Sequence, residues 1–260
     1  MKIPLPSPVV AALFSFASAA LFFTSACQTT PVIDPALLNP ATNSALRLEP
    51  RDANWVKRHE GFVALAKQGG IDVLFLGDSI TDFWRNRGQA VWEKNYGALH
   101  AANFGISADR TQHVLWRMAN GELDGLAPKV VVLMIGTNNT GFERDNVTPR
   151  NSAPQAAEGV KAIVRGLRAK LPATKILLLA IFPRGEKPTD PQRLQGGEIN
   201  QSLARLDDRK FVHYLDINAK FLAADGTLSK DIMPDFLHPN LRGYEIWADA
   251  IRAPLAELLK

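Results

Sequence analysis

Short apolar runs recur along the chain between segments of helical periodicity, and this alternation restricts the fold more than any other feature. The clearest run covers residues 130–135, and further runs cover 71–76, 98–104, 175–181 and 211–215. Strands that are apolar almost throughout are typical of a parallel sheet whose two faces are both covered by helices.

Helical patterns lie between and after these runs, at residues 80–95, 109–120, 154–170, 191–207 and 239–258. Alternating strands and helices indicate βαβ units. We therefore expect an α/β protein with a three-layer α/β/α architecture around a five-stranded parallel sheet, in one domain over residues 52–260. A composition with 46% hydrophobic and 22% charged residues excludes a mostly disordered chain, and one cysteine excludes a disulfide framework.

The first residues have a different character. Lys2 precedes an apolar run over residues 9–23, and small residues follow it up to Ala26, which is the layout of a signal peptide over residues 1–26. Cys27 stands directly after this stretch and resembles the lipidated cysteine of bacterial lipoproteins, although Thr24 stands where leucine is usual. We expect an exported protein with a lipid anchor on Cys27, or plain secretion after Ala26, and a Pro/Asn-rich tether over residues 27–51.

Charge and motifs exclude several classes of function. The net charge is +4 without a run of five or more basic residues, so we expect no nucleic-acid partner. A P-loop, a dinucleotide-binding fingerprint and a His-Glu-x-x-His motif are absent from the sequence, and so is a cluster of metal ligands. We expect neither a cofactor nor a metal site.

Polar residues follow several strands at the edge of the sheet where ligands bind in parallel α/β proteins. Gly-Asp-Ser-Ile-Thr stands at 77–81, Asn-Phe-Gly-Ile-Ser at 103–107, Gly-Thr-Asn-Asn at 136–139 and Asp-Phe-Leu-His at 235–238. A Gly-x-Ser-x-Gly elbow is missing, which argues against an α/β-hydrolase.

These four blocks, in this order, resemble those of the SGNH (GDSL-type) hydrolases, which have a flavodoxin-like fold. The resemblance covers about residues 70–250. The local runs at 77–84, 111–117 and 182–185 are similar, more narrowly, to the catalytic subunits of platelet-activating factor acetylhydrolase IB.

The resemblance implies a catalytic triad in which Ser79 is the nucleophile, His238 the general base and Asp235 its orienting carboxylate. A serine hydroxyl needs such a base, and an imidazole can take its proton and return it to the leaving alcohol. It also implies an oxyanion hole formed by the Ser79 N–H, the Gly105 N–H and the Asn138 side-chain amide. Taken singly, Ser79 could be a helix cap, Asp235 and His238 could flank a helix start as caps, and Gly105 or Asn138 could be a turn residue.

We therefore expect an exported serine esterase that hydrolyses short-chain esters, acetyl esters first, on small carbohydrate, polysaccharide or lipid substrates. Asp78 is expected to orient the loop before Ser79, and Asn103 to brace the Gly105 loop. An acyltransferase with the same triad and a non-catalytic, anion-binding flavodoxin-like protein are the alternatives.

Overall fold

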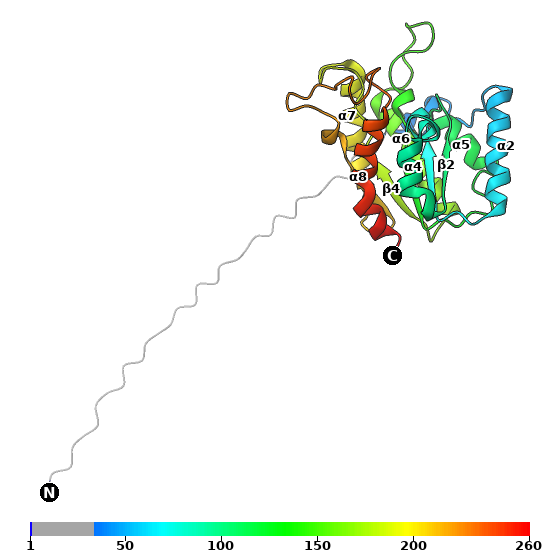
Figure 1. Cartoon of the computed structure of the whole chain (residues 1–260). Coiled ribbons are helices and arrows are strands. Elements are labelled where there is room, and N and C mark those ends of the chain that lie inside the picture. Colours follow the sequence, from blue (N-terminus) through cyan, green and yellow to red (C-terminus); the bar gives the residue numbers. More distant parts are fainter. Residues whose placement is uncertain (2–33) are drawn as a thin grey trace. The chain divides into compact units, whose positions relative to one another are not determined.

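Five parallel strands form a single sheet in the part of the chain that the structure, a computed structural model, describes: Met1 and residues 34–260 (Figure 1). The strands are β1 (Val73–Gly77), β2 (Ala101–Gly105), β3 (Val130–Met134), β4 (Lys175–Leu179) and β5 (Val212–Leu215). Their order in the sheet is β2-β1-β3-β4-β5. Each lies within or overlaps an expected run, which confirms the parallel α/β fold.

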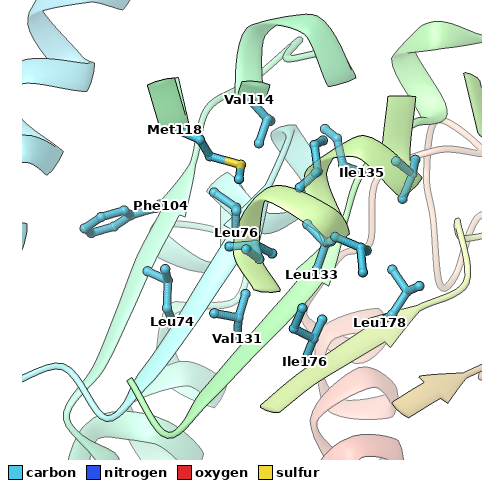
Figure 2. Packing of buried hydrophobic residues seen from close by; sticks show 14 of the residues in the cluster. Leu74, Leu76, Phe104, Val114, Met118, Val131, Leu133, Ile135, Ile176 and Leu178 are labelled. Carbon is cyan, nitrogen blue, oxygen red and sulfur yellow. The ribbon is translucent and has the colours of Figure 1, made fainter. Parts of the chain in front are cut away.

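Helices cover both faces of this sheet. One face packs against α2 (Ala53–Gln68), α5 (Thr111–Ala119), α6 (Ala153–Lys170) and α7 (Pro191–Ala204). The other packs against α4 (Gln89–Tyr96) and α8 (Leu241–Leu258). A hydrophobic core lies on each face of the sheet, and successive residues of a strand point into opposite cores. Leu74 and Leu76 face the core beside α2, α5, α6 and α7 (Figure 2), whereas Val73 and Phe75 face the core beside α4 and α8.

The expected helix over residues 80–95 is interrupted. Instead, α3 (Ser79–Asp82) passes into a 3₁₀ turn, η2 (Phe83–Arg85), and α4 begins only after Gly88. Gly88 lies against the buried side chains of Trp84 and Tyr244, where a Cβ atom would clash. Glycine is also unfavourable inside a helix, so the chain breaks at this position. The last helix likewise begins later than expected, at Leu241, with Asn240 as its cap.

Residues 34–51, which we expected to belong to the tether, are part of the compact unit formed by residues 34–260. This segment contains α1 (Pro35–Leu38) and the 3₁₀ turn η1 (Ser44–Leu46). Ala45 is fully buried, and its carbonyl accepts a hydrogen bond of 2.8 Å from Thr111 Oγ1 at the start of α5. The globular unit therefore begins before residue 52. Apart from Met1, the expected signal peptide lies outside the described residues, as do Cys27 and residues 28–33.

In the described residues, no helix has the length and apolar character needed to cross a bilayer.

Candidate active site

Ser79 lies two residues after the end of β1, as the first residue of α3. Asp78 caps this helix, because its Oδ1 accepts a hydrogen bond of 3.0 Å from Ile80 N, as we expected for a loop-orienting residue. The preceding Gly77 has no room for a side chain, since a Cβ atom would clash with Thr81 and the Met134 carbonyl. The chain therefore turns sharply out of the sheet and presents the Ser79 hydroxyl at the carboxyl end of β1.

His238 lies beside Ser79, although 159 residues separate them in the sequence. The distance between Ser79 Oγ and His238 Nε2 is 2.9 Å, and that between His238 Nδ1 and Asp235 Oδ2 is 2.7 Å. Both are hydrogen-bond distances. The structure thus brings together the three residues of the expected triad in a Ser–His–Asp relay.

Asp235 binds the backbone as well as the ring of His238. Its Oδ1 accepts hydrogen bonds from the main-chain N–H groups of Leu237 and His238, at 3.2 and 2.7 Å. Burial raises the pKa of Asp235, but the hydrogen bonds from the backbone and ring of His238 outweigh it, so the net shift of the pKa is downward. The lowered pKa favours the ionised carboxylate, which accepts from the imidazole.

Aromatic and cationic neighbours border this relay. The ring of Phe83 lies 5.0 Å from that of His238, measured between centroids. Arg87 stacks over Phe83, with Cζ 4.7 Å from the ring centroid, and its Nη1 lies 4.0 Å from Asp235 Oδ2. The interruption before α4 places both residues here.

Asn138 belongs to the 3₁₀ turn η4 (Thr137–Asn139), which follows β3. Its Nδ2 donates a 3.0 Å hydrogen bond to the carbonyl of Asp109, so one amide hydrogen fixes the side chain and the other remains for a ligand. The adjacent Asn139 is buried, and its amide binds Thr111, Gln112 and Asn151. The second asparagine of the Gly-Thr-Asn-Asn block therefore holds the turn that presents the first.

The structure corrects the expected role of Gly105. Its N–H donates a 2.9 Å hydrogen bond to Asn103 Oδ1 and is not free for substrate. Asn103 also donates to the carbonyl of Thr81 at 2.8 Å, which confirms that it braces the loop. Glycine is required at 105 for another reason: a Cβ atom would clash with the backbone of Asp78, Thr81 and Asp82. Gly105 thus allows β2 to pack closely against α3.

Ala108 lies in the turn after β2 and is not among the site residues predicted from the sequence. It is exposed, has a φ of +65° and lines a hollow together with Asn138. We find no hydrogen-bond partner for its N–H among residues 34–260. Alanine at a left-handed position has no sequence signature, so only the backbone conformation reveals it.

Two further charged groups lie close to the relay. Asp78 is completely buried, and burial raises its pKa from 3.8 to about 7. Arg184, from the 182–185 block, donates a 3.3 Å hydrogen bond to the carbonyl of Thr137. Burial, followed by the charge of Arg150, lowers the pKa of Arg184. The described residues contain no group of three or more His, Cys, Asp or Glu side chains placed to hold a metal ion.

Comparison with known proteins identifies the family of the chain. The model of the GDSL-like Lipase/Acylhydrolase family matches residues 75–246, which is more than half of the chain. The chain belongs to this family. It is a GDSL-type hydrolase, and the resemblance of the sequence to the SGNH hydrolases is confirmed.

Two of the curated relatives are subunits of platelet-activating factor acetylhydrolase IB. Platelet-activating factor acetylhydrolase IB subunit alpha2 of Rattus norvegicus is 40% identical over 209 residues, which cover 80% of this chain and 84% of that protein. The alpha1 subunit of Homo sapiens is 37% identical over 209 residues, covering 80% and 85%.

Solved structures with the same fold are more distant in sequence. A GDSL-like lipase from Bacteroides thetaiotaomicron superposes with a TM-score of 0.61 at 18% identity, covering 77% of this chain and 97% of that one. An acetylxylan esterase from Geobacillus stearothermophilus gives a TM-score of 0.58 at 19% identity, covering 73% and 94%. At these identities the likeness concerns the fold.

Proposed function

We propose that this GDSL hydrolase is an exported serine esterase that removes short acyl groups, acetyl first, through a Ser79–His238–Asp235 triad. The observation that carries this proposal is the unbroken relay of 2.9 and 2.7 Å contacts from Ser79 Oγ through His238 to Asp235. The 40% identity to an acetylhydrolase subunit supports acetyl as the acyl group.

The reaction proceeds through an acyl-enzyme. Ser79 Oγ attacks the ester carbonyl carbon while His238 Nε2 takes the hydroxyl proton, and the carbonyl oxygen becomes an oxyanion. The C–O bond to the alcohol then breaks, and His238 returns the proton to the leaving oxygen. Water, activated by the same imidazole, attacks the acyl-enzyme, releases the acid and restores Ser79. Asp235 holds the imidazole in the required tautomer and stabilises its protonated form.

Three donors are proposed to bind the oxyanion. The Ser79 N–H has no partner among the described residues because it lies in the first turn of a helix, and Asn138 has one amide hydrogen left. We assign the third donor to the Ala108 N–H in place of Gly105, because Asn138 is bonded to the carbonyl of Asp109, the next residue. The loss of one such donor typically lowers the rate by about 100-fold or more.

The experiment that tests the function measures hydrolysis of 4-nitrophenyl acetate by the native chain and two variants. Ser79→Ala and His238→Ala are each expected to lower kcat by about 10⁴-fold or more. Ser202→Ala, a serine on α7, is the matched control with unchanged turnover. Undiminished hydrolysis in both site variants would refute the assignment.

A second measurement tests the oxyanion donors. Asn138→Ala is expected to lower kcat by about 100-fold. Ala108→Gly keeps the N–H and relieves the positive φ, so it should retain turnover. A loss of activity in Ala108→Gly comparable to that in Asn138→Ala would contradict the assignment of a backbone donor at 108.

Short acetyl esters of carbohydrates are the proposed substrates, because we also propose export. We infer export from three features of the sequence: the apolar run that follows Lys2, the small residues before Cys27, and that cysteine itself. Membrane fractionation and mass analysis of the mature N-terminus test it, with Cys27→Ser as the variant. Mature chains that retain residues 1–26 would contradict export.

A further inference from the structure

Two adjoining hollows lie beside Asn138 and share three residues, Glu143, Arg144 and Arg150. One, of about 450 Å³, reaches Asn138 and Ala108. The other, of about 660 Å³, reaches Arg184. We name the two hollows together the arginine groove. Five arginines line it: Arg51, Arg110, Arg144, Arg150 and Arg184.

Positive charge is in excess along this groove. The acidic residues that line the two hollows are Glu143, Asp145 and Asp190, two fewer than the arginines. Glu143 is already paired with Arg110, which binds both of its carboxylate oxygens at 2.6 Å. The other two acids bind their own loops: Asp145 accepts from the backbone N–H groups of Val147 and Thr148, and Asp190 accepts from Lys187 N.

The guanidinium groups of Arg184 and Arg144 are not paired with a carboxylate of the described residues. Within residues 34–260, no carboxylate lies within ion-pair distance of either. The Nε atom of Arg150 is buried without a hydrogen-bond partner among these residues, and Glu143 Oε2 lies 3.7 Å away. Burial and the charge of Arg150 lower the pKa of Arg184, and the more weakly acting charges of Asp78 and Asp235 raise it, so the net shift is downward and the two guanidinium groups repel each other. An anion between them would relieve this repulsion.

Hydrogen bonds attach the groove to the proposed oxyanion hole. Arg150 donates to the carbonyl of Asn138 at 2.9 Å, and Arg184 donates to that of Thr137 at 3.3 Å, both in η4. On the other side, Arg51 donates to the carbonyl of Ser107 at 2.7 Å, next to Ala108. A group bound in the groove therefore lies next to the reacting ester.

We propose that the arginine groove binds a carboxylate or phosphate group on the alcohol part of the ester, so that the preferred substrates are acetyl esters of anionic compounds. The inference rests on the proposed esterase function and names its substrate class. An acetyl group is too short to carry a charge of its own, so the anionic group belongs to the alcohol. Arginine suits this task because its planar donors match the oxygens of a carboxylate or phosphate.

Two matched pairs of esters test the proposal and separate the two anions. The first pair is O-acetylated glucuronate and O-acetylated glucose, and the second is acetylglycerol phosphate and acetylglycerol. For at least one pair, the native chain should show a kcat/KM about tenfold or more higher for the anionic member, which corresponds to 1.4 kcal/mol. This ratio should shrink in 1 M salt, because salt screens the attraction.

The variants are Arg144→Gln and Arg184→Gln, with Arg205→Gln on the exposed end of α7 as the matched control. Each groove variant should lower the ratio of anionic to neutral kcat/KM by about fivefold, whereas Arg205→Gln should leave it unchanged. Thermal unfolding shows whether the variants are folded, and Arg144 is exposed, so its replacement keeps the test usable if Arg184→Gln unfolds.

The two possible failures are distinguishable. If the native chain hydrolyses 4-nitrophenyl acetate but prefers neither anionic ester, or if the groove variants keep the native ratio, the groove proposal is wrong and the esterase stands. If the native chain hydrolyses none of these esters, the esterase assignment itself fails.

Discussion

The hydroxyl group of Tyr244 donates a 2.7 Å hydrogen bond to the main-chain carbonyl of Ile80, the residue that follows Ser79. This contact connects α8 to α3 across 164 positions of the chain. The turn with His238 immediately precedes α8, and Ser79 opens α3. The bond therefore helps to set the distance between the nucleophile and its base.

Tyr244→Phe should weaken both the fold and the site. The ring is fully buried against Trp84 and Trp247, so phenylalanine keeps the packing but leaves the Ile80 carbonyl without this donor. We expect a loss of about 1–2 kcal/mol in the free energy of unfolding and a lower kcat. Tyr96→Phe is the control, because the buried Tyr96 hydroxyl has no partner among the described residues. Equal stabilities of the two variants would contradict the role of the bond.

Asp235→Asn should separate the two tasks of this side chain. The asparagine oxygen can still accept from the N–H groups of Leu237 and His238, so the turn should persist. Its amide nitrogen, however, donates where Oδ2 accepts from His238 Nδ1, which favours the wrong tautomer. We expect kcat for 4-nitrophenyl acetate to fall by about 10⁴-fold with an unchanged unfolding temperature. A variant that retains a tenth of the native rate would rule out this role for the carboxylate.

Asp78→Asn should stabilise the fold in a pH-dependent way. Burial raises the pKa of Asp78 from 3.8 to about 7. Between these two pH values the folded chain therefore holds a proton on Asp78 that the unfolded chain has lost. The contribution of Asp78 to stability is complete below pH 4 and is lost as the pH rises through 7. Asparagine keeps the cap to Ile80 N and carries no charge.

The unfolding free energy of Asp78→Asn minus that of the native chain should therefore be near zero at pH 4. It should reach a gain on the order of 4 kcal/mol at pH 8. Asp207→Asn, at a half-buried position past α7, is the control with no such trend. Denaturant unfolding at both pH values measures the difference, and a gain that is the same at pH 4 and pH 8 would contradict it.

The parallel sheet could be predicted because burial on both faces leaves a nearly unbroken apolar run. The triad positions could be predicted because the sequence blocks that contain them resemble those of the SGNH hydrolases. The break before α4 could not, because it depends on Gly88 packing against Tyr244, a residue far away in the sequence. Likewise, Ala45 is one small residue in a segment without periodicity, and only the folded chain shows that it is buried.

One of the proposed oxyanion donors, a backbone N–H, likewise could not be predicted from the sequence. The Gly105 N–H was an expected oxyanion donor, and glycine allows the backbone to approach a ligand closely. The close approach exists, but the neighbour is the backbone of α3 and not a substrate. A sequence reports that a position must be glycine and does not report which atoms lie beside it. The N–H of Ala108, which has no partner among residues 34–260, is a property of the main chain, and the side chain gives no sign of it.

Gly105→Ala tests this interpretation directly. The added methyl group would lie about where the main chain of Thr81 and Asp82 now stands, and backbone cannot move aside as a flexible side chain can. We expect a loss of about 3 kcal/mol, or roughly 6–12 °C in the unfolding temperature, and a lower kcat because α3 carries Ser79. Gly61→Ala is the matched control, since Gly61 lies inside α2 with open space around it and alanine favours the helix. If Gly105→Ala unfolds at the native temperature, the packing of β2 against α3 is not what requires glycine there.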